Sequence, residues 1–221
     1  DIQTGTRILS FFGHSEYILD IAFSLNGKYI LTSSSDHTAK LFDSQSGEEL
    51  QSYKGHSSTV CSCTFPPDSQ QVLTSSADHT AKLWNRHTGE LIHTFEGHTR
   101  LVHSCSFSPD GQMVLTSSFD GTIRLWDAQT GRQFKLLFEF GSLTPSNQAL
   151  FSPNNRIVIF AEKYTAILLD TQTGNVLHRL QHASWINSSA FSPDGAYAIT
   201  GSADGTAKLW DVHTGTLLRT F

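Results

Sequence analysis

The chain has few of the residues that cross-link proteins or anchor them in membranes. Its 221 residues include three cysteines and one methionine, and no apolar run is long enough to span a bilayer. An odd, low cysteine count argues against a disulfide framework and favours a reducing compartment. We therefore expect an intracellular protein, most simply a cytoplasmic one, with no membrane-inserted segment.

Charge is scarce as well. Only 16% of the residues are charged, with 15 lysines and arginines against 20 aspartates and glutamates. Proteins that bind the phosphate backbone normally carry a clustered basic face, so the composition gives no sign of a preference for nucleic acid. The motifs G-x-x-x-x-G-K-[ST], HExxH and G-x-S-x-G are missing from the sequence, and we expect no cofactor.

What the chain does have is a repeat of about 42 residues. One mark is a Gly-His pair, which stands at Gly13-His14, Gly55-His56 and Gly97-His98. A second mark is an aromatic residue followed by Asp or Asn, at Phe42-Asp43, Trp84-Asn85, Trp126-Asp127 and Trp210-Asp211. A period of this length indicates one small unit used several times, and such units stack because none buries its apolar face alone.

Each unit predicts four short antiparallel strands joined by tight turns. In the third unit and at its border these are residues 91–95, 102–107, 113–118 and 122–126. The recurring Asp-x-x-Thr-Gly segment predicts a turn in which Asp binds backbone N–H groups and Gly takes a positive φ. Along residues 102–107 the apolar positions Val102, Cys105 and Phe107 change parity, which predicts a β-bulge.

These marks make the chain similar to the WD40 repeat family. The resemblance implies an all-β propeller, with radially arranged blades of four antiparallel strands, and five repeats in this chain. It divides the chain into units 1–42, 43–84, 85–126, 127–169 and 170–210, followed by an extra strand at 211–221. Because such propellers usually have seven blades, we expect this array to be part of a larger ring, with one orphan strand at residues 1–12 or 211–221.

The fourth unit departs from the pattern. Gly141-Ser142 stands where Gly-His is expected, and Leu169-Asp170 stands where Trp-Asp is expected. Glu162, Lys163 and Tyr164 replace the usual turn after the third strand. We expect this blade to form without the internal polar network of the others.

A recurring set of His, Ser, Asp and Trp invites two interpretations. Ser-His-Asp can form a hydrolase triad, but an active site has no reason to be copied into every blade. The resemblance implies instead a structural hydrogen-bond network in which Asp accepts, His bridges, the Ser hydroxyl relays and the Trp N–H donates. Its members would be His14, Ser34, Asp36, His56, Ser76, Asp78, Trp84, His98, Ser118, Asp120, Trp126, His182, Ser202, Asp204 and Trp210.

Eleven histidines raise the question of a metal site. They are spread around the array by repetition, and no His/Cys/Asp cluster has ligand spacing, so we expect no metal. Cys63 and Cys105 are one repeat apart, which predicts that both fill the core as small apolar residues.

Positions that differ from unit to unit are the candidates for recognition. In proteins that the chain resembles, the loops after Gly-His and the turns before the repeated Asp line one rim of the ring, where peptides dock. Aromatic residues and Arg are enriched at binding hot spots, although each could also pack under a neighbouring loop. The candidates are Tyr17, Arg100, Leu101, Phe119, Lys163 and Trp185.

The resemblance fixes architecture more firmly than function. It favours a non-enzymatic scaffold that binds proteins or peptides on the rim, within a larger protein or assembly. A sensor or regulatory module of a multidomain enzyme, such as an NTPase or a kinase, is the alternative. A propeller that is itself a hydrolase or lyase would need a unique polar cluster near its axis, and none is visible in the sequence.

Overall fold

The computed structural model describes residues 6–139 and 149–221, and all regular elements within these ranges are β-strands. Antiparallel pairing joins them into five sheets of four strands each. These sheets are the blades, numbered here in chain order. The predicted all-β fold of four-stranded antiparallel blades is therefore confirmed.

Each blade contains four consecutive strands. Blade 1 comprises β1 (Ile18–Phe23), β2 (Tyr29–Ser34), β3 (Thr38–Asp43) and β4 (Glu49–Lys54). Blade 2 comprises β5 (Val60–Thr64), β6 (Gln71–Ser76), β7 (Ala81–Asn85) and β8 (Leu91–Phe95). Blade 3 comprises β9 (Val102–Phe107), β10 (Met113–Ser118), β11 (Thr122–Asp127) and β12 (Gln133–Glu139). Blade 4 comprises β13 (Leu150–Phe151), β14 (Ile157–Glu162), β15 (Thr165–Asp170) and β16 (Val176–Gln181). Blade 5 comprises β17 (Ile186–Phe191), β18 (Tyr197–Ser202), β19 (Ala207–Asp211) and β20 (Leu217–Thr220).

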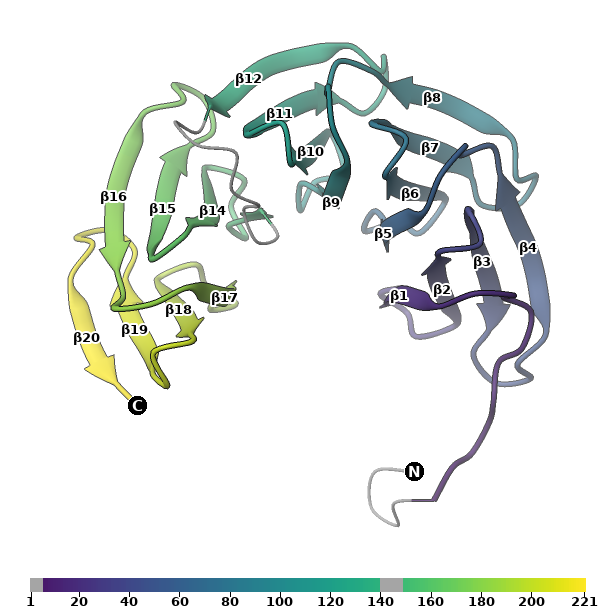
Figure 1. Cartoon of the computed structure of the whole chain (residues 1–221), viewed down its shortest axis with the longest axis horizontal. Coiled ribbons are helices and arrows are strands. Elements are labelled where there is room, and N and C mark those ends of the chain that lie inside the picture. Colours follow the sequence, from purple (N-terminus) through teal and green to yellow (C-terminus); the bar gives the residue numbers. More distant parts are fainter. Residues whose placement is uncertain (1–5, 140–148) are drawn as a thin grey trace.

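The five blades are arranged as an arc (Figure 1). The first strands β1, β5, β9 and β17 lie nearest the centre, and the fourth strands β4, β8, β12, β16 and β20 form the outer edge. The arc is open between blade 1 and blade 5. Ring closure is not seen within the described residues.

The blades do not coincide with the sequence units. Each sheet takes its three inner strands from one unit and its outer strand from the next; β4, for example, belongs to unit 43–84 but pairs with β3. β20 pairs with β19 in the same way and completes blade 5, so the segment 211–221 is not an orphan. Residues 6–12 form no strand, although the Phe11 ring packs edge-on against Phe42 with centroids 5.6 Å apart.

The hydrophobic core lies between blades rather than at the centre of the arc. Leu31, Leu41 and Tyr53 of blade 1 pack against Val60, Val72 and Trp84 of blade 2, and equivalent clusters join each later pair of blades. Cys63 and Cys105 are 3% and 1% exposed within two of these clusters, which confirms their core position. Burial of each such aliphatic or aromatic side chain contributes roughly 1.5–3 kcal/mol to the stability of the folded chain.

The outward faces of blades 1 and 5 carry apolar residues like those of the inner blades, but no adjacent blade covers them within the described residues. Leu73 and Phe95 of blade 2 are fully buried, whereas their equivalents in blade 5, Ile199 and Phe221, are 40% and 60% exposed. On blade 1, Ile21 is 59% exposed. Both ends of the arc therefore present apolar sheet faces to solvent.

The predicted turn chemistry and bulge are confirmed. In the turn after β11, Asp127 Oδ1 accepts hydrogen bonds from the N–H and the hydroxyl of Thr130 at 2.7 and 2.8 Å. Gly131 takes φ of +70°, and a Cβ there would lie 2.8 Å from the His93 ring. The β9–β10 register shifts between Ser117 and Ser118, where a bulge was expected.

Some sequence predictions fall outside the described residues, namely Gly141-Ser142 and the Asp1–Gly5 turn. Within residues 6–139 and 149–221, no helix is long and apolar enough to cross a membrane.

Candidate functional site

The antiparallel order of the strands gives each blade two ends. One end carries the loops that lead into each first strand and the turns between second and third strands, which we call the loop face. The other end carries the turns between first and second strands and between third and fourth strands, which we call the turn face. Hydrogen bonds from Phe119 N to Leu101 O on the loop face, and from Ala128 N to Gln112 O on the turn face, join neighbouring segments of each end.

A buried polar network supports the loop face in blade 2. His56 Nδ1 lies 2.7 Å from Asp78 Oδ2, and His56 Nε2 lies 2.8 Å from Thr74 Oγ1. The Trp84 indole N–H donates to the same Thr74 hydroxyl at 2.9 Å. With Asp78 ionised, His56 donates through Nδ1 and accepts the Thr74 proton at Nε2, so the chain of bonds runs from carboxylate to indole.

The same network recurs in two other blades and is shortened in a third. His98 and Trp126 share Thr116 in blade 3, and His182 and Trp210 share Thr200 in blade 5. In blade 1, His14 forms hydrogen bonds with Asp36 and Thr32, but the Phe42 ring has no N–H to donate. The paired aspartates of blades 3 and 5 are Asp120 and Asp204.

The serine hydroxyls do not act as the relay that the sequence suggested. Ser76 Oγ accepts from the Asp78 N–H at 3.0 Å and donates to the Ser58 carbonyl at 3.2 Å, so it ties the turn to the loop. The relay is threonine, two residues earlier on the same strand and therefore on the same side of the sheet. Ser34, Ser118 and Ser202 repeat the role of Ser76.

The network holds its carboxylates ionised. Burial alone would raise the pKa of Asp36, but hydrogen bonds from Thr38, His14 and Ser15 outweigh it and lower the pKa to about 2. Burial lowers the pKa of His98 below its usual value, against the opposing effect of Asp120. The pair is thus a neutral imidazole donating to a carboxylate.

This geometry does not match a hydrolytic triad. A nucleophilic serine must reach the imidazole, yet His56 Nε2 is occupied by Thr74 and Ser76 is bonded to backbone groups. Among the residues that the structure describes, no group of three or more His, Cys, Asp or Glu could hold a metal ion.

Blade 4 replaces the network with apolar packing. Phe160 stands at the threonine position and Leu169 at the tryptophan position, and both are fully buried. Phe160 packs against Phe138 of blade 3 with centroids 5.0 Å apart. Replacing the threonine hydroxyl and the indole together by apolar groups leaves no unpaired donor at these two positions, which is compatible with an intact sheet.

The rim candidates of blade 3 form one group on the loop face. Arg100 is exposed, Leu101 is half-buried, and Phe119 is 38% exposed. The Phe119 ring packs against His103 at 5.3 Å between centroids, and the Phe119 N–H donates to the Leu101 carbonyl. These contacts hold Phe119 in place while leaving part of its ring accessible.

A second group joins blades 4 and 5. The Ile186 N–H donates to the Lys163 carbonyl, and the His182 N–H donates to the Tyr164 carbonyl. Tyr164 and Trp185 meet edge to face at 5.7 Å, and they are 41% and 42% exposed. Tyr164 was absent from the sequence-based candidates; its place beside Lys163 in the irregular turn was the available signal.

Tyr17 stands apart from both groups. It lies on blade 1 and is 79% exposed, and its carbonyl accepts from the Ser35 N–H. The structure therefore places all six rim candidates on the loop face, five of them in two groups and Tyr17 by itself.

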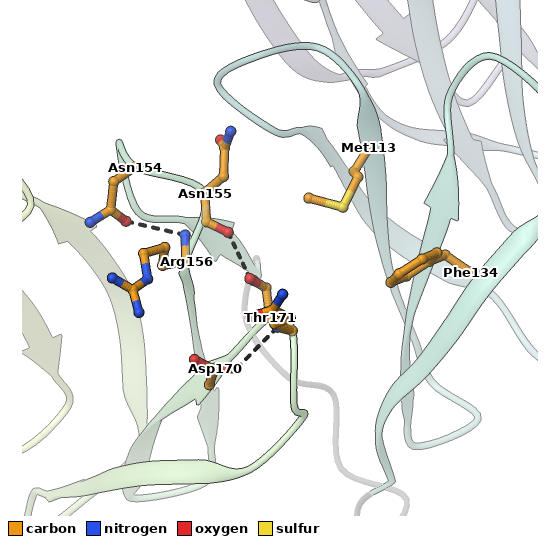
Figure 2. Close-up of a pocket in the computed structure, with 8 residues that line it drawn as sticks. Met113, Phe134, Asn154, Asn155, Arg156, Asp170 and Thr171 are labelled. Atoms are coloured by element: carbon orange, nitrogen blue, oxygen red, sulfur yellow. Dashed lines mark hydrogen bonds between the residues drawn. The ribbon is translucent and has the colours of Figure 1, made fainter.

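The turn face has pockets between blades. One of about 280 Å³ lies between blades 3 and 4, and Figure 2 shows Met113 and Phe134 on one side of it and Asn155, Arg156 and Thr171 on the other. Between blades 1 and 2 the guanidinium of Arg86 lies over the Tyr29 ring, 4.2 Å from its centroid. Both residues line a pocket of about 360 Å³ there, and Met113 and Thr171 occupy the equivalent positions between blades 3 and 4.

Comparison with known proteins matches the repeats seen in the structure. The family described as WD domain, G-beta repeat matches residues 5–43, 47–85, 89–127 and 174–211, which leaves out much of blade 4. The chain is 53% identical over 36 residues to Protein pleiotropic regulatory locus 1 of Arabidopsis thaliana and 53% identical over 38 residues to WD repeat-containing protein 38 of Homo sapiens. It is 44% identical over 46 residues to Periodic tryptophan protein 2 of Saccharomyces cerevisiae (strain ATCC 204508 / S288c). These segments cover 16%, 17% and 21% of this chain, and 7%, 12% and 5% of the three relatives.

Proposed function

The chain belongs to the WD domain, G-beta repeat family, and from this premise we propose that it is a non-enzymatic platform whose loop face binds a protein or peptide. The proposal includes assembly with protein partners in a reducing intracellular compartment, in keeping with three free cysteines. Rigid blades that present variable loops are suited to this role, because the scaffold limits the ordering entropy of the binding surface.

The observation that carries the proposal is the contrast between core and loop face. Equivalent core positions hold similar apolar residues in successive blades, whereas one loop position holds Tyr17, Thr59, Leu101 and Trp185 in turn. A surface that recognises one asymmetric partner must differ from blade to blade. Partly exposed aromatic rings such as Phe119 and Trp185 are the kind of residue that dominates binding energy.

The test is site-specific photo-crosslinking of the 221-residue chain in extract of its source cells. A benzoyl-phenylalanine is placed at position 119 or 185, and at position 134 of the turn face as a control for exposure, since Phe134 is 64% exposed. We expect the same protein or peptide to be cross-linked from positions 119 and 185 and not from 134. Equal cross-linking from all three positions would contradict the assignment.

A further inference from the structure

The turn face has an apolar hollow beside the centre of the arc. It has a volume of about 510 Å³, and its walls include Phe65, Phe107 and Phe151, which stand at or just after the ends of β5, β9 and β13. Phe23 and Leu25 of blade 1 complete one side and are 64% and 82% exposed. Its volume is within the range of ligand pockets, roughly 300–1,000 Å³.

The hollow is built on rigid parts of the fold. Phe65, Phe107 and Phe151 each pack against a different cluster between blades, so the rings are held on one side by the core. The first–second strand turns add Pro66, Pro67 and Pro109 to the wall. Among the described residues, no charged side chain lines the hollow. A preformed apolar site loses little conformational entropy when a ligand binds.

The surroundings of the hollow are acidic. Asp68 and Asp110 directly follow the lining prolines Pro67 and Pro109, and both aspartates are exposed. Each uses Oδ1 to accept a backbone N–H of its own turn, from Gln70 and from Gln112 at 3.0 Å, and neither has an ion-pair partner among the described residues. Negative charge therefore stands next to the apolar walls.

The rest of the turn face has the same sign. Hydrogen bonds from backbone N–H groups keep the pKa of Asp43 and Asp211 below the usual value, so both stay ionised. Acidic residues in the ten turns of this face outnumber basic ones: they are Asp43, Glu48, Asp68, Glu90, Asp110, Asp127, Asp170, Asp194 and Asp211, against Lys28, Arg86, Arg132 and Arg156. Lys28 and Arg156 line pockets between blades rather than the hollow.

We propose that this hollow is a second docking site, distinct from the loop face, for a partner segment that carries an aromatic or leucine side chain flanked by lysine or arginine. The apolar side chain enters between Phe65, Phe107 and Phe151. The flanking cations lie against Asp68 and Asp110. Charge complementarity selects a basic segment over an acidic one, and the apolar walls select it over a purely polybasic one.

Two equivalent turns of the chain show how the negative charge of Asp68 and Asp110 can be removed. Asn26 and Asn154 occupy the positions of Asp68 and Asp110 in blades 1 and 4. Both accept the backbone N–H two residues further on through Oδ1, at 3.0 and 3.1 Å, as the two aspartates do. The Asp68→Asn, Asp110→Asn double variant should therefore keep both turns. Leu25→Ser removes an apolar wall that is 82% exposed, so it should not affect folding.

The experiment measures fluorescence anisotropy of three labelled peptides on the intact chain. One has a central phenylalanine flanked by lysines, one has alanine at the centre, and one has glutamate flanks. We expect saturable binding of the first and at least about tenfold weaker binding of the other two, since each loses one of the two matching interactions. Leu25→Ser should weaken binding of the first peptide. The double asparagine variant should also weaken this binding and make it depend less on salt concentration.

Leu218→Ser, on the outer strand β20 and 50% exposed, is the control and should leave binding unchanged. The proposal is overturned by equal binding of the alanine or glutamate peptide, by equal losses in Leu218→Ser and Leu25→Ser, or by no saturable binding of the phenylalanine peptide. None of these outcomes bears on the loop face, so the two sites can fail independently.

Discussion

At the residue scale, the sequence predicts which residues belong to the polar network better than it predicts which of them form hydrogen bonds with each other. The 42-residue spacing picks out His56, Asp78 and Trp84, and these residues are joined by hydrogen bonds in the structure. The spacing led us to assign the hydroxyl that joins histidine and tryptophan to serine rather than threonine. Ser76 and Thr74 recur with equal regularity, so the period alone cannot tell which hydroxyl reaches the two rings. The strand register explains the choice: Trp84 pairs with Val72, so its indole N–H reaches Thr74 two residues further along β6, whereas Ser76 lies at the end of β6 beside the turn.

Asp78→Ala is expected to lower the free energy of unfolding by roughly 1–3 kcal/mol, because the backbone N–H groups of Ser57 and Thr80 lose their acceptor. Glu162→Ala in blade 4 is the matched control. Among the described residues, the Glu162 side chain has only a long 3.9 Å ion pair with the exposed Arg179, of a kind typically worth about 0–1 kcal/mol. Urea unfolding measures both, and equal losses would contradict a structural role for the network.

The depressed pKa of Asp36 predicts acid sensitivity. Its folded value is about 2 and an unfolded aspartate titrates near about 3.9, so the unfolded chain takes up the proton more readily. The stability it contributes is complete above about pH 5 and is lost as pH falls through 4 toward 2. Urea midpoints measured over this range should fall less steeply in Asp36→Asn than in the unaltered chain; parallel curves would contradict the assignment.

At the element scale, strands and turns follow directly from local sequence. The Asp-x-x-Thr-Gly turns and the bulge in β9 are both present where the residue pattern predicts them. The sheets themselves could not be assigned from the repeat, because a repeat has no natural starting point. Only pairing shows that β4 belongs with β3 and β20 with β19.

Because blades pack against one another, the stability lost on mutating a repeat position depends on whether a neighbouring blade covers it. Leu73→Ala should cost roughly 2–5 kcal/mol, because Leu73 is fully buried between blades 2 and 3. Ile199→Ala, at the equivalent position of blade 5, should cost much less, because Ile199 is already 40% exposed. Chemical denaturation compares the free energies of unfolding of the two variants. Similar losses would contradict the claim that the outward face of blade 5 is uncovered.

At the scale of the whole molecule, the sequence predicts an array but not its closure. Blade number follows from counting repeats, whereas closure depends on how the end faces meet. The exposed Ile21 and Ile199 show that each end of this arc lacks the cover that inner blades receive. Exposed apolar sheet faces and unpaired strand edges favour association.

The isolated 221-residue chain should therefore self-associate. Sedimentation velocity is expected to show an average mass that rises with concentration, and the Ile21→Lys, Ile199→Lys double variant should reduce the rise by placing charge on both end faces. A monodisperse, closed monomer at all concentrations would contradict the account of the end blades.

The central claim is that the loop face binds a partner through its exposed aromatic residues. The most direct test is calorimetric titration of a cross-linked partner with the unaltered chain, with Phe119→Ala, with Trp185→Ala and with both changes together. Circular dichroism checks folding, and Phe134→Ala on the turn face is the control. If the two rings are hot spots, each change should cost about 2 kcal/mol or more of binding free energy while Phe134→Ala costs little. Binding that survives the double variant unchanged would contradict the loop-face assignment.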